Sequence, residues 1–124
     1  MPNRGRWVWL DDERREPVGW ERVRTSVECI ESLANGGVDI VSLDHDLAVE
    51  HYENTAAGRK CTGYDVALWL ECQAIMGEWA LVPKDLRCHS LNPAGRARIL
   101  AAFASIERRR AATATVVTVA GEEG

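Results

Sequence analysis

The sequence predicts an α/β domain with a short parallel sheet and crossover helices, and three observations support this. Short runs rich in β-branched, aromatic and leucine side chains alternate with segments of helical periodicity. The helical segments begin at capping residues, and the strand candidates end at titratable side chains. Such alternation gives right-handed crossovers with helices on one face of the sheet or on both. A two-layer and a three-layer domain therefore both remain open.

The first predicted strand, Arg6 to Leu10, is aromatic and β-branched and ends in the acidic pair Asp11 and Asp12. Thr25 and Glu28 then have the spacing of a capping box, which predicts a helix. The expected apolar face of this helix and its stop signal are Val27, Ile30, Leu33 and Ala34, then Asn35-Gly36-Gly37.

The second predicted strand runs from Ile40 to Asp44, and charged side chains stand at its carboxyl end. Asp44, His45 and Asp46 follow the apolar run directly. In open parallel sheets, ligands collect beyond the carboxyl ends of the strands, so this cluster is placed for chemistry. A turn whose Asp side chains bond their own backbone is the structural alternative.

Residues 48–61 are polar and contain glycine, so they are expected to form a loop on the strand-end side of the sheet. Thr62 and Asp65 repeat the capping-box spacing and predict the next helix. That helix is heavily apolar, through Val66, Leu68, Trp69, Leu70 and Ile75.

A third short strand is predicted from Leu86 to Ser90, and Asn92-Pro93 then opens another helix. The periodic residues of this helix are Ile99, Leu100, Phe103 and Ile106. Arg108-Arg109-Arg110 is expected to end the helix, because cations suit its negative terminus. The β-prone residues 114–120 then predict either an added strand or contact with a second copy.

Length and charge bound the class of protein. With 124 residues the chain is expected to form a single domain over residues 1–112, followed by a β-prone and then acidic tail over 113–124. The net charge of −4 argues against binding to long duplex nucleic acid, which needs a basic face. No apolar run is long enough to span a bilayer, and no signal peptide is recognised, so a cytoplasmic protein without a membrane partner is expected.

The four cysteines are scattered without metal-binding spacing and are expected to be reduced. Cys29, Cys72 and Cys88 are expected to be small core residues.

If the three predicted strands are parallel neighbours, their polar ends converge at one edge of the sheet. Asp11 and Asp12, Asp44 to Asp46, and His89 with Ser90 would then lie close together. Clustered carboxylates repel one another unless a cation or protons intervene. The sequence therefore predicts a functional site at this edge.

Four motifs in order resemble the cyclic-phosphate processing receiver-like family. The residues that carry the resemblance are Leu10-Asp11-Asp12-Glu13-Arg14 with Pro17 and Gly19-Trp20, Ser42-Leu43-Asp44-His45-Asp46-Leu47, Thr62-Gly63-Tyr64-Asp65-Val66 with Trp69-Leu70, and His89-Ser90 with Asn92-Pro93 and Gly95-Arg96. The match spans about positions 8 to 100. Ala48 stands where the family pattern has Gly, and Ala94 where it has Val.

The resemblance implies a shortened flavodoxin-like or receiver-like fold. It also implies an activity on cyclic phosphates, either RNA 2′,3′-cyclic ends or cyclic nucleotides, so a small phosphorylated nucleotide or an RNA end is the expected partner. By analogy with receivers, Asp11, Asp12 and either Asp44 or Asp46 would hold Mg²⁺ or Mn²⁺. A phosphorelay function is less favoured, because Lys60 and Lys84 are the only lysines and neither can take the lysine role of receivers.

Two imidazoles suggest the chemistry. His45 and His89 are candidates for base and acid in opening a cyclic phosphodiester, and Asp44 and Asp46 would orient them. The candidate phosphate ligands are Arg14, Ser90, Asn92, Gly95 and Arg96, because guanidinium groups and helix-start amides bind anions.

Each imidazole also has a structural explanation, as a member of a capped turn for His45 and as a bonded strand-end residue for His89. Trp20 and Tyr64 are candidates for stacking on a base, whereas the other tryptophans are expected in the core. A non-catalytic module that binds a phosphorylated ligand or a protein partner is the alternative function. The sequence leaves the oligomeric state open.

Overall fold

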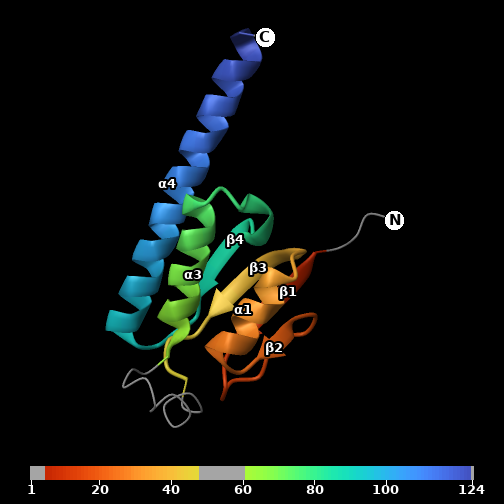
Figure 1. Ribbon diagram of the computed structural model, residues 1–124. Coiled ribbons are helices and arrows are strands. Elements are labelled where there is room, and N and C mark those ends of the chain that lie inside the picture. The colour runs from red at the N-terminus through yellow and green to blue at the C-terminus, as the bar shows by residue number, and fades with distance from the viewer. Residues whose placement is uncertain (1–4, 48–60, 124) are drawn as a thin grey trace.

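The computed structural model describes residues 5–47 and 61–123, with side chains described as far as residue 113 (Figure 1). The loop predicted over 48–61, including Lys60, therefore lies outside the described residues except for Cys61. All four cysteines are free thiols; Cys29 is buried, whereas Cys72, which was expected in the core, is exposed.

A four-stranded parallel sheet forms the centre of the fold. Its strands are β1 (Arg6–Leu10), β2 (Glu21–Val23), β3 (Val38–Leu43) and β4 (Asp85–Cys88), in the order β2-β1-β3-β4. The predicted parallel α/β class is confirmed. The edge strand β2 was not predicted, because three residues of mixed polarity show no strand periodicity.

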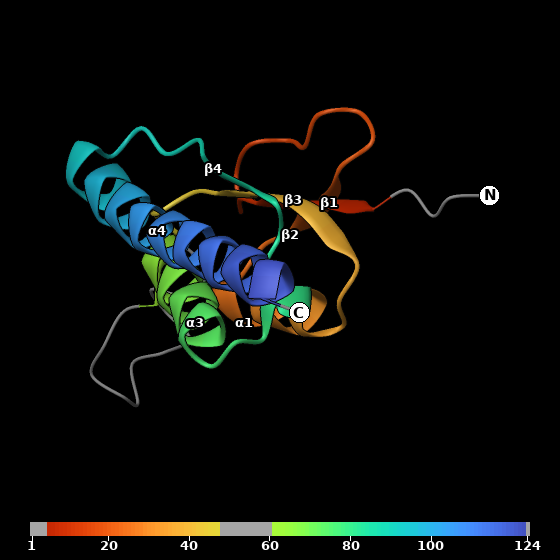
Figure 2. The same cartoon turned by 90° about the horizontal axis from the view of Figure 1, so that it is seen from above.

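Helices cover one face of the sheet, so the domain has two layers (Figure 2). These helices are α1 (Ser26–Ala34), α3 (Gly63–Ile75) and α4 (Pro93–Glu123), with a short 3-10 helix, η2 (Trp79–Leu81), before β4. One continuous core joins them to the sheet through Val8, Leu10, Cys29, Leu33, Val41, Leu43, Leu47, Val66, Ala67, Leu70, Ala74, Val82, Ile99, Ala102, Phe103 and Ile106. The core therefore fixes the carboxyl ends of β1, β3 and β4 relative to one another.

The opposite face of the sheet, called here the outer face, carries aromatic side chains. Trp7 and Trp9 alternate with the core residues of β1, and Trp20 packs against both at ring-centroid distances of 5.7 Å. Trp20 ends the segment 11–20, which connects β1 to β2 without a helix. Trp7 and Trp9 were expected in the core; they are instead half-buried on the outer face because strand side chains alternate between faces.

The helix starts agree with the capping patterns. Thr62 and Asp65 form a full capping box at α3, and the Thr25 side chain accepts a hydrogen bond from the Glu28 amide at α1. The predicted apolar face of α1 is partly wrong, because Val27 is 54% exposed and Ala34 is also exposed. Ser26 and Cys29 take the sheet-facing side in their place, as small side chains that the apolar pattern does not single out.

Helix α4 does not end at the arginine triplet and continues to Glu123, so residues 114–120 are helical rather than a strand. Extending an existing helix avoids the cost of nucleation, and the alanines that follow the triplet favour it. The arginine triplet therefore lies in the interior of the helix and not at its end. Arg110 donates to the Pro83 carbonyl at 3.0 Å and pairs with Glu107 at 3.0 Å. Within the described residues, no helix has the length and hydropathy needed to cross a bilayer.

Candidate functional site

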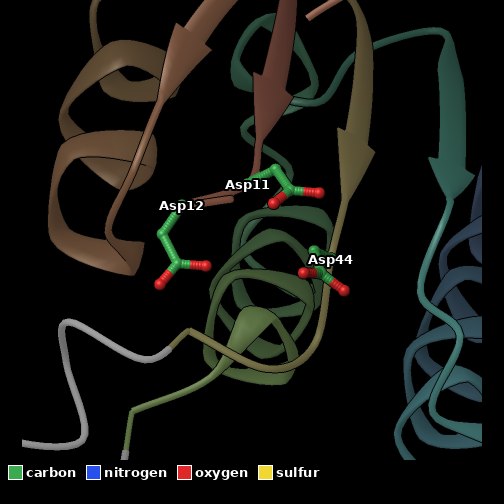
Figure 3. Close-up of side chains that lie close together, drawn as sticks. All are labelled: Asp11, Asp12 and Asp44. Atoms are coloured by element: carbon green, nitrogen blue, oxygen red, sulfur yellow. The ribbon is translucent and has the colours of Figure 1, made fainter. Parts of the chain in front are cut away.

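Three carboxylates meet beyond the ends of β1 and β3 (Figure 3). Asp11 and Asp12 follow β1, and Asp44 follows β3, as the convergence argument predicts. Each can offer an oxygen within 4.8 Å of the others. Asp11 is fully buried and Asp44 is 9% exposed.

The carboxylate of Asp11 has several hydrogen-bond donors. Its Oδ1 accepts hydrogen bonds from the amides of Glu13 (2.9 Å) and Arg14 (2.8 Å), and its Oδ2 lies 3.1 Å from His89 Nε2. Burial by itself would raise the pKa of Asp11, but the two amides and the His89 ring outweigh it and hold the pKa below its usual value. Asp11 is therefore ionised at neutral pH.

Asp44 has fewer partners and the opposite shift. Its Oδ1 accepts from the His45 amide at 2.9 Å and lies 3.9 Å from Arg14 Nη2. Burial, followed by the negative charge of Asp11, raises the pKa of Asp44. A cation beside these two carboxylates would relieve the repulsion that raises it.

The three carboxylates fit a hard divalent cation. Mg²⁺ and Mn²⁺ prefer carboxylate oxygens and retain several waters, and Asp11, Asp12 and Asp44 supply only such oxygens. Asp46, the alternative third ligand, has its contacts with His45 and Asn92 instead. The group Asp11, Asp12 and Asp44 is therefore the better candidate metal site.

Arg14 bridges the two buried carboxylates. Its Nε lies 3.4 Å from Asp11 Oδ2, and its side chain is 44% exposed. The indole of Trp9 donates to the Arg14 carbonyl at 3.3 Å and anchors the backbone there. Arg14 thus reaches from the acidic cluster into solvent, where an anion can approach it.

His89 lies at the inner side of the cluster with contacts on both ring nitrogens. Its Nδ1 is 2.7 Å from Ser42 Oγ, its Nε2 is 3.1 Å from Asp11 Oδ2, and its side chain is only 12% exposed. The ring stacks on Trp9, with centroids 3.7 Å apart and planes 3° apart. Burial lowers the pKa of His89, against the opposing effect of Asp11.

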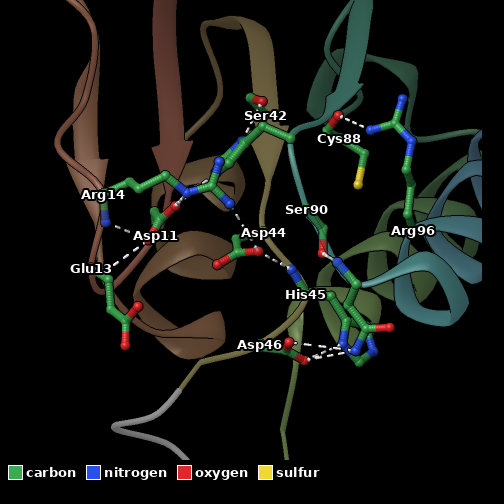
Figure 4. A network of polar contacts seen from close by, with 12 residues as sticks. Asp11, Glu13, Arg14, Ser42, Asp44, His45, Asp46, Cys88, Ser90 and Arg96 are labelled. Atoms are coloured by element: carbon green, nitrogen blue, oxygen red, sulfur yellow. Dashed lines mark hydrogen bonds and ion pairs between the residues drawn. The ribbon is translucent and has the colours of Figure 1, made fainter.

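His45 lies on the other side of Asp44, at the start of α4 (Figure 4). Its Nδ1 is 2.8 Å from Asp46 Oδ1, and Asp46 also accepts from Asn92 Nδ2 at 3.1 Å. A Cβ on Gly95 would collide with Cγ of His45, so only glycine leaves room for this ring. Gly63 has a similar role at the start of α3, because a Cβ there would collide with the Asp44 carbonyl.

Among the predicted phosphate ligands, Ser90, Asn92 and Gly95 are brought to the His45 side of the site. Ser90 Oγ accepts from the Asn92 amide at 3.1 Å, and Asn92 Oδ1 caps α4 by accepting from the Gly95 amide at 3.0 Å. Arg96 is not brought there: Nη1 donates to the Cys88 carbonyl at 2.7 Å, and Figure 4 shows its side chain beside Cys88, separated from Asp11 and Asp44.

Two residues of the site were missed in the sequence: Ser42 and Trp9. They are register partners on β3 and β1 and share the outer face. The available signal was a serine inside an apolar strand, which alternation places opposite the core residues Val41 and Leu43. Its partner His89 lies 47 positions further on, and only the folded sheet brings the two together.

A short parallel sheet in this strand order, with acidic side chains after neighbouring strands, defines a receiver-like α/β domain. The family model of the cyclic-phosphate processing receiver domain matches residues 6–105, and the chain belongs to this family. No curated protein and no solved structure gives a significant match.

Proposed function

We propose that this protein is a phosphoesterase that opens a cyclic phosphate, either an RNA 2′,3′-cyclic end or a cyclic nucleotide. The observation that carries the proposal is the placement of His45 beside the cluster of Asp11, Asp12 and Asp44. A bound cation would stabilise the developing charge, and an oriented imidazole would act as general base, both of which accelerate phosphodiester hydrolysis. Family membership supports the substrate class.

His45 is the group that we assign to proton transfer. In the tautomer that donates Nδ1–H to Asp46, the lone pair lies on Nε2, for which the described residues show no partner. Nε2 takes a proton from the attacking water as the new P–O bond forms and the ring P–O bond breaks. His45 Nε2–H or solvent water then gives a proton to the leaving oxygen, which completes hydrolysis to a phosphomonoester.

The remaining groups bind the phosphate. A divalent cation held by Asp11, Asp12 and Asp44 would supply Lewis-acid stabilisation of the developing charge. Arg14 offers a guanidinium to two phosphate oxygens, because its side chain reaches solvent from between the two carboxylates. Arg96, held at Cys88, is left out of this assignment.

Turnover of a substrate panel tests the proposal. The protein is incubated with 2′,3′-cyclic and 3′,5′-cyclic nucleotides and a short RNA with a 2′,3′-cyclic end, each with Mg²⁺, with Mn²⁺ and with a chelator. We expect a phosphomonoester product, lost by about 10²–10⁴-fold in His45→Gln. His51→Gln is the matched control, because it removes an imidazole to which the proposal assigns no role. Saturable binding without product would replace the proposal with the non-catalytic binding module.

The phosphorelay alternative stays the weaker one on structural grounds. Among the described residues the only lysine is Lys84, which precedes the first residue of β4 and so lies at the amino end of the sheet. The acidic cluster lies at the carboxyl end. A small phosphodonor should therefore leave no phospho-aspartate on the protein.

A further inference from the structure

The second imidazole of the site is enclosed by residues from neighbouring strands. Ser42 comes from β3, Asp11 follows β1, and Trp9 of β1 covers one face of the His89 ring. Ser42 is 3% exposed and Asp11 is fully buried, so both ends of this chain of contacts are closed to solvent. No ring nitrogen of His89 is left for a substrate.

The contacts define where the ring hydrogen sits. Oδ1 of Asp11 already accepts from two backbone amides, and an ionised carboxylate can only accept, so His89 Nε2 must carry a hydrogen. In the tautomer with its N–H on Nε2, the ring accepts the Ser42 hydroxyl hydrogen at Nδ1, and the hydrogen bonds run from Ser42 through His89 to Asp11.

We propose that Ser42 and Trp9 are positioning residues that hold His89 as a fixed N–H donor to Asp11, so that His89 orients a metal-binding carboxylate and transfers no proton to substrate. The proposal rests on the proposed function in giving Asp11 a role in metal binding. Proton transfer is thereby left to His45 alone.

The geometry at Asp11 shows what this orientation achieves. The contact of Asp11 Oδ2 with Arg14 Nε is the longest of its described contacts, at 3.4 Å, whereas the two amides and His89 lie at 2.8–3.1 Å. If Asp11 holds a cation, His89 would keep the carboxylate oriented through Oδ2, the oxygen that Arg14 contacts more weakly. Partners behind a metal ligand of this kind typically change metal affinity or activity by about 10–100-fold when removed.

The first test needs neither metal nor substrate. Two-bond ¹H–¹⁵N spectra of the metal-free protein at neutral pH should show the His89 hydrogen on Nε2 and an unprotonated, hydrogen-bonded Nδ1. In Ser42→Ala the Nδ1 resonance should move toward that of a nitrogen without a hydrogen bond, and Ser42→Thr should restore it. A hydrogen on Nδ1 in the wild type, or an unchanged spectrum in Ser42→Ala, would overturn the proposal.

The second test separates orientation from proton transfer. Mn²⁺ affinity, measured by electron paramagnetic resonance, should fall about 10–100-fold in Ser42→Ala and in His89→Ala. His89→Gln keeps an N–H donor and should bind Mn²⁺ more tightly than His89→Ala. Unchanged affinity in Ser42→Ala and His89→Ala, or equal losses in the Gln and Ala variants of His89, would refute the assignment.

Turnover gives the last comparison. His89→Gln should retain more activity than His89→Ala, whereas His45→Gln and His45→Ala should be equally inactive. Equal inactivity of both His89 variants, with Mn²⁺ affinity preserved in His89→Gln, would make His89 a proton-transfer group. If the wild type hydrolyses no cyclic phosphate, the proposed function fails, and the spectra and Mn²⁺ affinities still decide the role of Ser42.

Discussion

The two halves of the site differ in how completely their polar atoms are satisfied. The closed half consists of Asp11, His89, Ser42 and Trp9, and the open half consists of Asp44, His45, Asp46 and Asn92. In the closed half the Asp11 carboxylate has several donors and its pKa is lowered, whereas in the open half burial and a neighbouring charge raise the pKa of Asp44. Two carboxylates of the same cluster therefore differ in how firmly their surroundings hold them ionised.

The largest effect should come from breaking the closed half. Asp11→Asn replaces an acceptor oxygen by an amide that meets the N–H of His89, so we expect a loss of about 3–5 kcal/mol in the free energy of unfolding at pH 7. Denaturant melts measure this. Because the folded pKa of Asp11 is lowered, its contribution is present above the ordinary value of 3.8 and disappears as pH falls through the lower folded value. A loss that grows toward acid pH would contradict the assignment.

Metal addition tests both halves together, because the candidate ligands Asp11 and Asp44 belong to different halves. A Mg²⁺ concentration about one hundred times its Kd should stabilise the wild type by about 2.7 kcal/mol, seen as a rise in Tm. Asp44→Asn should remove most of this rise, because one of three ligands loses its charge. The same ionic strength of NaCl serves as the control. An equal rise with NaCl would indicate screening of the carboxylates instead of a bound cation.

Gly95 tests the packing of the open half. Gly95→Ala places a methyl group at the position of the His45 ring, so we expect a loss of about 1–3 kcal/mol in the free energy of unfolding, as for other overpacked sites. Turnover should fall as well, because the ring must leave its place beside Asp46. Wild-type Tm together with wild-type turnover would show that the ring has room to spare.

The smallest effect has the opposite sign. Asp44→Asn should stabilise the protein at neutral pH by about 0.5–2 kcal/mol, while activity falls. The raised folded pKa means that ionised Asp44 costs stability above that pKa, and that this cost is absent below the ordinary value of 3.8. The stabilisation should therefore vanish in melts below that pH. A variant less stable than the wild type at pH 7 would remove the distinction between the two halves.

The sequence was sufficient for the regions of the molecule in which local patterns and topology agree. The capping residues Thr25 and Thr62 mark true helix starts, and the parallel arrangement brings Asp11, Asp12 and Asp44 together. Local patterns failed for β2, which pairs through its backbone with little side-chain signal. They also failed for the end of α4, where propagation of an existing helix outweighs β propensity.

The site itself could be predicted in position but only partly in detail. Residue types at strand ends identified the acidic cluster and both imidazoles. Residue types could not show that the His89 ring contacts Ser42 while the His45 ring contacts Asp46. These contacts depend on the path that the chain takes after each strand. Likewise Arg96 resembled a phosphate ligand in sequence, and only the fold shows its guanidinium at the Cys88 carbonyl.

The connection between β1 and β2, residues 11–20, contains no helix. It links the acidic cluster to the aromatic outer face of the sheet. Its first residues, Asp11 and Asp12, supply two of the three clustered carboxylates, and its last, Trp20, packs on the aromatic side of the sheet. Loss of the indole at position 20 would therefore expose hydrophobic surface and loosen the acidic end in a single event. A substitution in this connection that suits a new ligand must therefore also keep Trp20 packed on Trp7 and Trp9.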